Sequence, residues 1–362
     1  MRIGIILHGP EIVDVGSAKQ IIDLFRQEHE VIVKLGGTMG RTAVLDAGLE
    51  NVIDISQGLT PSETILSIKD SIYLAILLNH GKTLDTGRHF GALVASKIPC
   101  FPLVHIESPD CGGRIIYYSP HFKRCAEYVR NILHGTYDLP IESGKPAPFS
   151  VRQEGELVIR RVSGAFCGEN IRLDGIVIGE VMRPEPEIVC REGRIVGLRG
   201  INIKPHGLEK LENRKLDLFT AKIKTGNIRR SLHEPRIKKV KHGENIAIID
   251  HCAESTFELV KEAGIVITVG DDTTTIAADI LARLGIPVIG IVDGDMDGVL
   301  VNTVVPAGSV IIRVKPGFDD IVGREVFETV MGGKLRHSME KGELLARILA
   351  LAGKYTVDIT YY

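Results

Sequence analysis

The sequence predicts an α/β protein built on doubly wound, mostly parallel Rossmann-like sheets. Apolar, β-branched runs alternate with segments whose apolar residues recur at helical spacing, both near the start of the chain and in its last third. Most of these runs are apolar at nearly every position, as expected of strands covered by helices on both faces. Short β-rich runs interrupt the alternation in the middle. We therefore expect a Rossmann-like N-terminal sheet, a small β-rich insert and a second, Rossmann-like or similar α/β unit on the C-terminal side.

The first expected part is an α/β domain over 1–142. Its apolar runs predict strands at 2–9, 30–37, 51–56, 71–81 and 101–108. Helices are predicted after the N-cap Ser17, at 38–48, at 61–69 and at about 86–97. This order of strand and helix is typical of a doubly wound parallel sheet.

Glycines at the ends of these strands predict a phosphate-binding loop. Main-chain N–H groups at a β-to-α turn can contact a phosphate where no side chain intervenes. The candidate residues for binding a phosphate or nucleotide are Gly9, Gly36, Gly37, Gly40, Arg41 and Arg114. The glycine spacing differs from the G-x-G-x-x-G dinucleotide motif, so a dinucleotide is not specified. A small phosphate-bearing ligand is the expected partner, with 108–125 as a loop over the mouth of its pocket.

Three histidines, His8, His80 and His105, also lie near strand ends. If their strands are neighbours in the sheet, the imidazoles could converge on a metal ion or a phosphate. The alternative is that each histidine makes one hydrogen bond at its own strand end. The sequence leaves both interpretations open.

The composition changes after residue 142. Short β-rich runs between Gly, Pro or Asp turns fill 143–206 and predict a small barrel or sandwich. A helix and a connector are expected over 207–243. Within them, 222–242 carries eight Lys or Arg residues and one Glu, which fits either a nucleic-acid backbone contact or a solvated connector.

The last expected part, 244–362, is a second α/β unit, and 246–298 has the clearest pattern in the chain. Apolar strands are predicted at 246–250, 265–270 and 286–293. The helices between them end at Gly264 and Gly285, because glycine is favoured in a left-handed C-cap. A further strand at 309–317, helices at 323–333 and 341–353 and an edge strand at 355–362 complete the unit.

Aspartates follow each strand of 246–298. They are Asp250, then Asp271 and Asp272, then Asp293, Asp295 and Asp297. In a parallel sheet these positions meet at one edge, and crowded carboxylates commonly face a cation. We expect a Mg²⁺ site with Asp250, Glu254, Asp293 and Asp295 as candidate ligands. Asp271 and Asp272 are either further ligands or helix caps, and 293–298 is otherwise a turn.

This unit resembles the Toprim domain of primases and topoisomerases, on the stretch LGIPVIGIVDGDMDG. The resemblance implies that the last strand ends in an Asp-x-Asp that holds Mg²⁺ and that the first ends in a glutamate. Here Asp250 or Glu254 would have to take the place of that glutamate. The resemblance covers about 50 residues and leaves metal-assisted phosphate chemistry open.

Composition restricts the class of protein. The 362 residues carry a formal charge of −2, which argues against a general nucleic-acid binder. The six cysteines form no C-x-x-C pair, and no signal peptide or apolar run long enough for a bilayer is present. We expect a reduced, cytoplasmic protein with no membrane partner, and the sequence leaves assembly into a homo-oligomer open.

The stretches RIGIILHGPEIVDVGSA, GGTMGRTAVLDAGLE and VGDDTTTIAADILARLGIPVIGIVDGDMDG together resemble an archaeal family of unknown function, found chiefly in methanogens. That resemblance implies a cytoplasmic archaeal protein and no particular chemistry. Three hypotheses follow from the residues: an enzyme that uses Mg²⁺ on a phosphate-bearing substrate, a non-catalytic nucleotide or cofactor sensor, and a Toprim-type nucleic-acid processing protein. A metal-dependent phosphotransferase or phosphohydrolase is the first of these.

Overall fold

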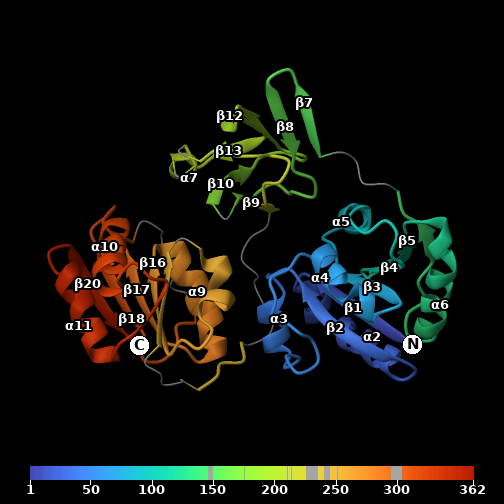
Figure 1. The fold of residues 1–362 in the computed structure, drawn as a ribbon, viewed down its shortest axis with the longest axis horizontal. Helices are drawn as coiled ribbons and strands as arrows, with labels where there is room; N and C mark the ends of the chain where they lie inside the picture. Colours follow the sequence, from blue (N-terminus) through green and yellow to red (C-terminus); the bar gives the residue numbers. More distant parts are fainter. Residues whose placement is uncertain are drawn as a thin grey trace. The chain divides into compact units, whose positions relative to one another are not determined.

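The computed structural model describes residues 1–145, 150–174, 176–209, 211–212, 214–225, 235–239, 245–250, 252–294 and 304–362. The chain divides into two compact units, which we call unit 1 (Met1–His233) and unit 2 (Glu234–Tyr362) (Figure 1).

Unit 1 begins with a six-stranded, mostly parallel sheet in the order β2-β1-β3-β4-β5-β6. Its strands are β1 (Arg2–His8), β2 (Glu30–Gly36), β3 (Leu74–Asn79), β4 (Leu103–Glu107), β5 (Arg114–Tyr117) and β6 (Ile141–Ser143). Strands β2, β1, β3 and β4 are parallel, whereas β5 is antiparallel to β4. The expected loop over 108–125 is therefore wrong in its middle, because a tight turn after β4 sends the chain back as β5.

Helices cover both faces of this sheet, as the apolar runs predicted. They are α1 (Glu11–Asp14), α2 (Ser17–Arg26), α3 (Arg41–Asp46), α4 (Pro61–Ile68), α5 (Leu84–Ser96) and α6 (Lys123–Leu133). Side chains of α2 and α6 share one core with β1, and side chains of α4 and α5 share another with β3. The doubly wound α/β class is confirmed. The expected strand at 51–56 is reduced to a single bridge between Lys34 and Asp54.

The β-rich part of unit 1 contains two four-stranded sheets, in the orders β13-β10-β9-β14 and β12-β11-β8-β7. The strands are β7 (Val151–Glu154), β8 (Leu157–Arg161), β9 (Asn170–Leu173), β10 (Ile176–Val181), β11 (Glu187–Arg191), β12 (Arg194–Arg199), β13 (Ile201–Ile203) and β14 (Ile223–Thr225). They enclose one apolar core. This part extends past the expected boundary at 206, because β14 pairs with β9 after the short helix α7 (Pro205–Glu209).

Unit 2 is a second doubly covered sheet, in the order β19-β15-β16-β17-β18-β20. Its strands are β15 (Asn245–Asp250), β16 (Ile265–Val269), β17 (Val288–Val292), β18 (Val310–Val314), β19 (Arg336–Ser338) and β20 (Thr356–Tyr361). Its helices are α8 (Thr256–Leu259), α9 (Asp271–Leu284), α10 (Asp319–Glu325) and α11 (Lys341–Ala352). The four central strands are parallel, and β19 and β20 cover their edges in antiparallel pairing.

The two faces of this sheet have separate cores. Helices α10 and α11 pack on one face, and α9 packs on the other. Gly285 ends α9 in the left-handed conformation, with φ of 70°, as predicted. The carboxyl ends of β16 and β17 are thus left side by side next to the start of α9.

Candidate functional site

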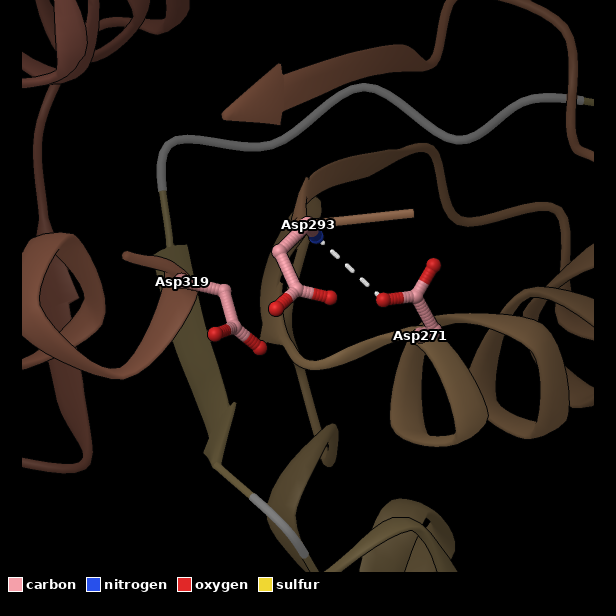
Figure 2. Close-up of side chains that lie close together, drawn as sticks. All are labelled: Asp271, Asp293 and Asp319. Carbon is pink, nitrogen blue, oxygen red and sulfur yellow. Dashed lines mark hydrogen bonds between the residues drawn. The ribbon is translucent and has the colours of Figure 1, made fainter. Parts of the chain in front are cut away.

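Three aspartates meet at the carboxyl end of the sheet in unit 2. Asp271 is the first residue of α9, Asp293 follows β17, and Asp319 is the first residue of α10. Each offers a carboxylate oxygen, and these oxygens all lie within 4.8 Å of one another. Figure 2 shows the three side chains approaching from three separate segments. We call these residues the aspartate triad.

The local backbone explains why the triad forms. Gly270, with φ of 94°, lets the chain turn from β16 directly into α9, a conformation that glycine adopts readily. The Asp271 carboxylate then accepts hydrogen bonds from the backbone N–H groups of Asp293 and Gly294, each at 3.2 Å. In turn, Gly317 N–H donates to Asp293 at 2.7 Å. Main-chain donors from two loops therefore fix the positions of two triad carboxylates.

Within the triad, Asp271 is nearly buried and lies next to a second carboxyl group, that of Asp293. Asp271 is only 8% exposed. Burial, together with the neighbouring carboxylate of Asp293, raises the pKa of Asp271 to about 7, although the two backbone donors act in the opposite direction. A divalent cation between the oxygens would remove this penalty.

The triad and the ligands expected from the sequence overlap at one residue, Asp293. Asp250 lies exposed at the end of β15, outside the triad. The side chain of Glu254 and the whole of Asp295 lie outside the described residues. The sequence marks Asp271 as either a further ligand or a helix cap, whereas it gives no prediction for Asp319. The signal for Asp319 is the stretch KPGFDD after β18, which places an acid at the start of the next helix.

The glycines at the carboxyl end of the sheet in unit 1 divide into two kinds. An added Cβ at Gly36 would meet Pro61 at 2.7 Å, and one at Gly40 would meet the carbonyl oxygen of Gly9 at 2.7 Å, so these two positions serve close packing. Gly9 and Gly37 have φ of 78° and 96° and need glycine for their conformation. Phosphate binding by these glycines stays a prediction.

The two arginines of the expected phosphate site lie in different settings. Arg41 is the first residue of α3, and its side chain is fully buried. Arg114 lies on β5, where its guanidinium donates to the carbonyl oxygens of Gly112 and Gly113, each at 2.7 Å. Their role in phosphate binding is likewise untested.

A buried polar network joins the carboxyl ends of β1, β3 and β4. His8, Asn79 and Glu107 are aligned across these three neighbouring strands. Nδ1 of His8 lies 2.9 Å from Oδ1 of Asn79, and the Asn79 amide donates to Glu107 at 2.7 Å. His105 connects to Glu107 at 3.0 Å through Nε2 and to the Tyr118 hydroxyl at 2.9 Å through Nδ1. We call these five residues the polar network.

The network answers the question about the three histidines in part. His8 and His105 belong to one hydrogen-bonded network, so they do more than make isolated bonds. His80 instead faces Asp110, with 3.3 Å between Nε2 and the carboxylate. Among the described residues, no metal-ligand group includes a histidine.

Two further expectations concern other parts of the chain. Of the basic segment 222–242, residues 226–234 and 240–242 lie outside the described residues, and nucleic-acid binding through it stays a prediction. In the parts of the chain that the structure covers, no helix combines the length and apolar character needed to cross a bilayer.

Comparisons with known proteins indicate the descent of the chain and assign it no activity. A family model described as "Uncharacterized protein conserved in archaea (DUF2117)" matches residues 5–334. A relative from Methanocaldococcus jannaschii, described as an uncharacterized protein, is 42% identical over 330 residues, which is 90% of each chain. Neither match confirms the likeness to Toprim domains.

Among solved structures, L-asparaginase I from Vibrio cholerae aligns with 98% of this chain and 99% of its own, at 14% identity and a TM-score of 0.21. A TM-score this low supports no conclusion about activity. The match to the family model and the 42% identity to the relative show that the chain belongs to the archaeal DUF2117 family.

Proposed function

We propose that unit 2 binds a divalent cation, Mg²⁺, through Asp271, Asp293 and Asp319. The observation that carries the proposal is the convergence of three carboxylate oxygens from separate segments within 4.8 Å. All three donors are hard oxygen atoms with no His or Cys among them, the donor set that favours Mg²⁺, Ca²⁺ or Mn²⁺ over Zn²⁺. The raised pKa of Asp271 supports the same assignment, because a cation would stabilise the charged form.

We further infer that the cation holds a phosphate-bearing ligand. Mg²⁺ is commonly bound by a few carboxylates and completes its coordination with water and substrate phosphate oxygens. Helix α9 starts at Asp271 and is 14 residues long, so its positive N-terminal dipole lies next to the cation and favours an anion there. When bound, the metal would polarise a phosphoryl oxygen; the aspartates would hold it, and the start of α9 would orient the anion.

The cation proposal is tested by thermal unfolding and calorimetry of the full chain. In EDTA, changing Asp293→Asn together with Asp319→Asn should leave stability equal or raised, because carboxylate repulsion is relieved. Millimolar Mg²⁺ or Mn²⁺ should stabilise the unchanged protein by about 2.7 kcal/mol at a hundredfold excess over Kd. The double variant should not respond, and Asp358→Asn, on exposed β20, should respond like the unchanged protein.

The phosphate step is tested separately with nucleoside triphosphates. Metal-dependent release of phosphate that the double variant loses supports an enzyme, whereas metal-dependent binding without turnover supports a sensor. Identical melting curves in EDTA and in excess Mg²⁺ and Mn²⁺ contradict the cation site itself.

A further inference from the structure

The polar network belongs to unit 1 and shares no residue with the aspartate triad of unit 2. Its hydrogen bonds determine which atom donates and which accepts at nearly every contact. The two oxygens of Glu107 receive four bonds, from the Asn79 amide, Nε2 of His105, the backbone N–H of Gly81 at 2.6 Å and the hydroxyl of Ser108 at 2.7 Å. An ionised carboxylate accepts such bonds and donates none. Burial alone would raise the pKa of Glu107, but the hydrogen bond and charge interaction with His105, together with the bonds from Asn79 and Gly81, outweigh it and hold that pKa below its usual range.

The charge on Glu107 fixes the orientation of Asn79. Its NH₂ group must face Glu107, since a carboxylate requires a donor, and its carbonyl oxygen then faces His8. A carbonyl oxygen can only accept, so Nδ1 of His8 must carry the proton. Glu107, Asn79 and His8 thus form a chain of donors and acceptors that selects one tautomer of His8.

That tautomer leaves the lone pair of Nε2 available. No described residue bonds Nε2, and His8 is only partly buried. The imidazole is stacked on Phe90, with ring centroids 3.9 Å apart and an angle of 18° between planes. Burial lowers the pKa of His8, against the opposing effects of the Asn79 bond and the Glu107 charge, so the ring is neutral at pH 7. Of the charged and titratable groups, Glu107 and His105 are those that act on it.

The residue beside this edge of the imidazole is Gly37, which has no side chain. A Cβ built at Gly37 would meet only one atom within 4 Å among the described residues, Cδ2 of His8 at 3.9 Å. Cδ2 is bonded to Nε2, so the unfilled space over Gly37 adjoins the edge of the ring that carries the lone pair.

We propose that this edge of unit 1 is a second ligand site, in which Nε2 of His8 accepts a hydrogen bond from an O–H or N–H group of an uncharged small molecule seated over Gly37. Asn79 and Glu107 are positioning residues, since they act through His8. An uncharged ligand is favoured over an anion because the His8 imidazole is neutral and the carboxylate of Glu107, bonded to the same Asn79, is negative. The shared chemistry is that of alcohols, amides and nucleosides.

Acylation of imidazole by diethyl pyrocarbonate, located by peptide mass spectrometry on the full chain, tests whether the lone pair is open. The reagent attacks an unprotonated ring nitrogen that it can reach. His8 should be modified, as should His134, whose side chain is 78% exposed, whereas fully buried His105 should not. An unmodified His8 beside a modified His134 overturns the site.

Protection tests the class of ligand. In a panel of uncharged alcohols, amides and nucleosides, a member that binds should slow modification of His8 about tenfold at ten times its Kd, with no change at His134. Protection by inorganic phosphate, or by no member of the panel, overturns the assignment to an uncharged ligand.

The positioning role has a spectroscopic readout. In ¹⁵N NMR spectra of the imidazoles, His8 should carry its proton on Nδ1, and Asn79→Leu should abolish that preference in a protein that still folds by circular dichroism. Asn79→Gln, which retains a carboxamide, should restore part of it. A proton on Nε2 in the unchanged protein contradicts the donor and acceptor chain described above.

Discussion

Both α/β units place a buried carboxyl group where parallel strands end, Glu107 in unit 1 and Asp271 in unit 2. The pKa values of these two groups are shifted in opposite directions. Both side chains are nearly inaccessible, 0% and 8% exposed. Glu107 faces four hydrogen-bond donors, and its pKa is lowered. Asp271 faces two backbone donors and further carboxylates, and its pKa is raised to about 7. Burial is common to both, so the neighbours decide the sign of the shift.

The two carboxyl groups differ in their neighbours: hydrogen-bond donors surround Glu107, whereas a second carboxyl group adjoins Asp271. In unit 1 every oxygen of the carboxylate is satisfied within the protein, so the charge stabilises the fold. In unit 2 the Asp271 carboxyl is buried against the carboxyl of Asp293, which disfavours its charged form. Removing each charge and measuring stability tests this difference most directly.

Glu107→Gln should have the largest effect. The new amide places two N–H donors where the pocket supplies donors, so His105, Asn79 or Ser108 loses its acceptor. We expect a loss of about 2–4 kcal/mol, because hydrogen bonds to a charged group are worth about 1.5–3 kcal/mol each and at least one buried donor loses its acceptor. Chemical denaturation followed by circular dichroism measures it. Glu154→Gln, at an exposed ion pair with Arg152, should cost less than about 1 kcal/mol, and equal losses for the two variants would contradict the role of Glu107.

Gly87→Ala tests how tightly the surroundings of Glu107 are packed. Helix α5 lies so close to the network that an added Cβ at Gly87 would be 2.0 Å from the carboxyl carbon of Glu107. Alanine ordinarily stabilises a helix interior by about 1 kcal/mol relative to glycine, but here we expect a loss of about 1–3 kcal/mol from overpacking.

A matched glycine tests that sign. A Cβ at Gly197, in β12, would meet only the side chain of Val189, at 3.7 Å or more, so Gly197→Ala should be neutral or stabilising in the same thermal melts. Stabilisation by both alanines would mean that the network tolerates displacement.

The smallest effect concerns the pH dependence of unit 2 without metal. The folded-state pKa of Asp271 is raised from 3.8 to about 7, so the folded protein binds the extra proton between these values. Its contribution to stability is full below pH 3.8 and is lost as the pH rises through about 7. In EDTA, Asp271→Asn should therefore flatten the stability profile between about pH 4 and 7 and leave the variant more stable than the unchanged protein at pH 8.

Metal should reverse this dependence in the unchanged protein, because a bound cation favours the ionised carboxylate. Melting temperatures across pH, with EDTA and with Mg²⁺, measure both effects. A stability that rises between pH 5 and 8 in EDTA, and that Asp271→Asn leaves unchanged, would contradict the raised pKa.

The sequence predicted the parallel strands of both sheets because their apolar runs are nearly unbroken, whereas β5, β6 and β19 are too short to show such a run. It predicted Asp293 because acid follows such a run. It could not predict Asp319 as a partner, since α10 begins four residues before the helix expected at 323 and only the folded loop after β18 brings it to Asp293. Likewise His8, Asn79 and Glu107 each stood at a visible strand end, but their contact depends on the order β1-β3-β4. That order is a property of three-dimensional pairing between distant segments.

The position of β20 has a consequence for synthesis of the chain. β20 pairs with the edge of β18 but follows it after α10 and α11, and α11 packs on the same core as β18. A growing chain that has made the parallel strands of unit 2 therefore carries an unpaired, apolar strand edge until Thr356–Tyr361 emerge from the ribosome. Such an edge can pair with another nascent chain. During biogenesis, pairing of β20 with β18 therefore ends the exposure of this strand edge to other chains. Translation products that stall before β20 should require chaperones.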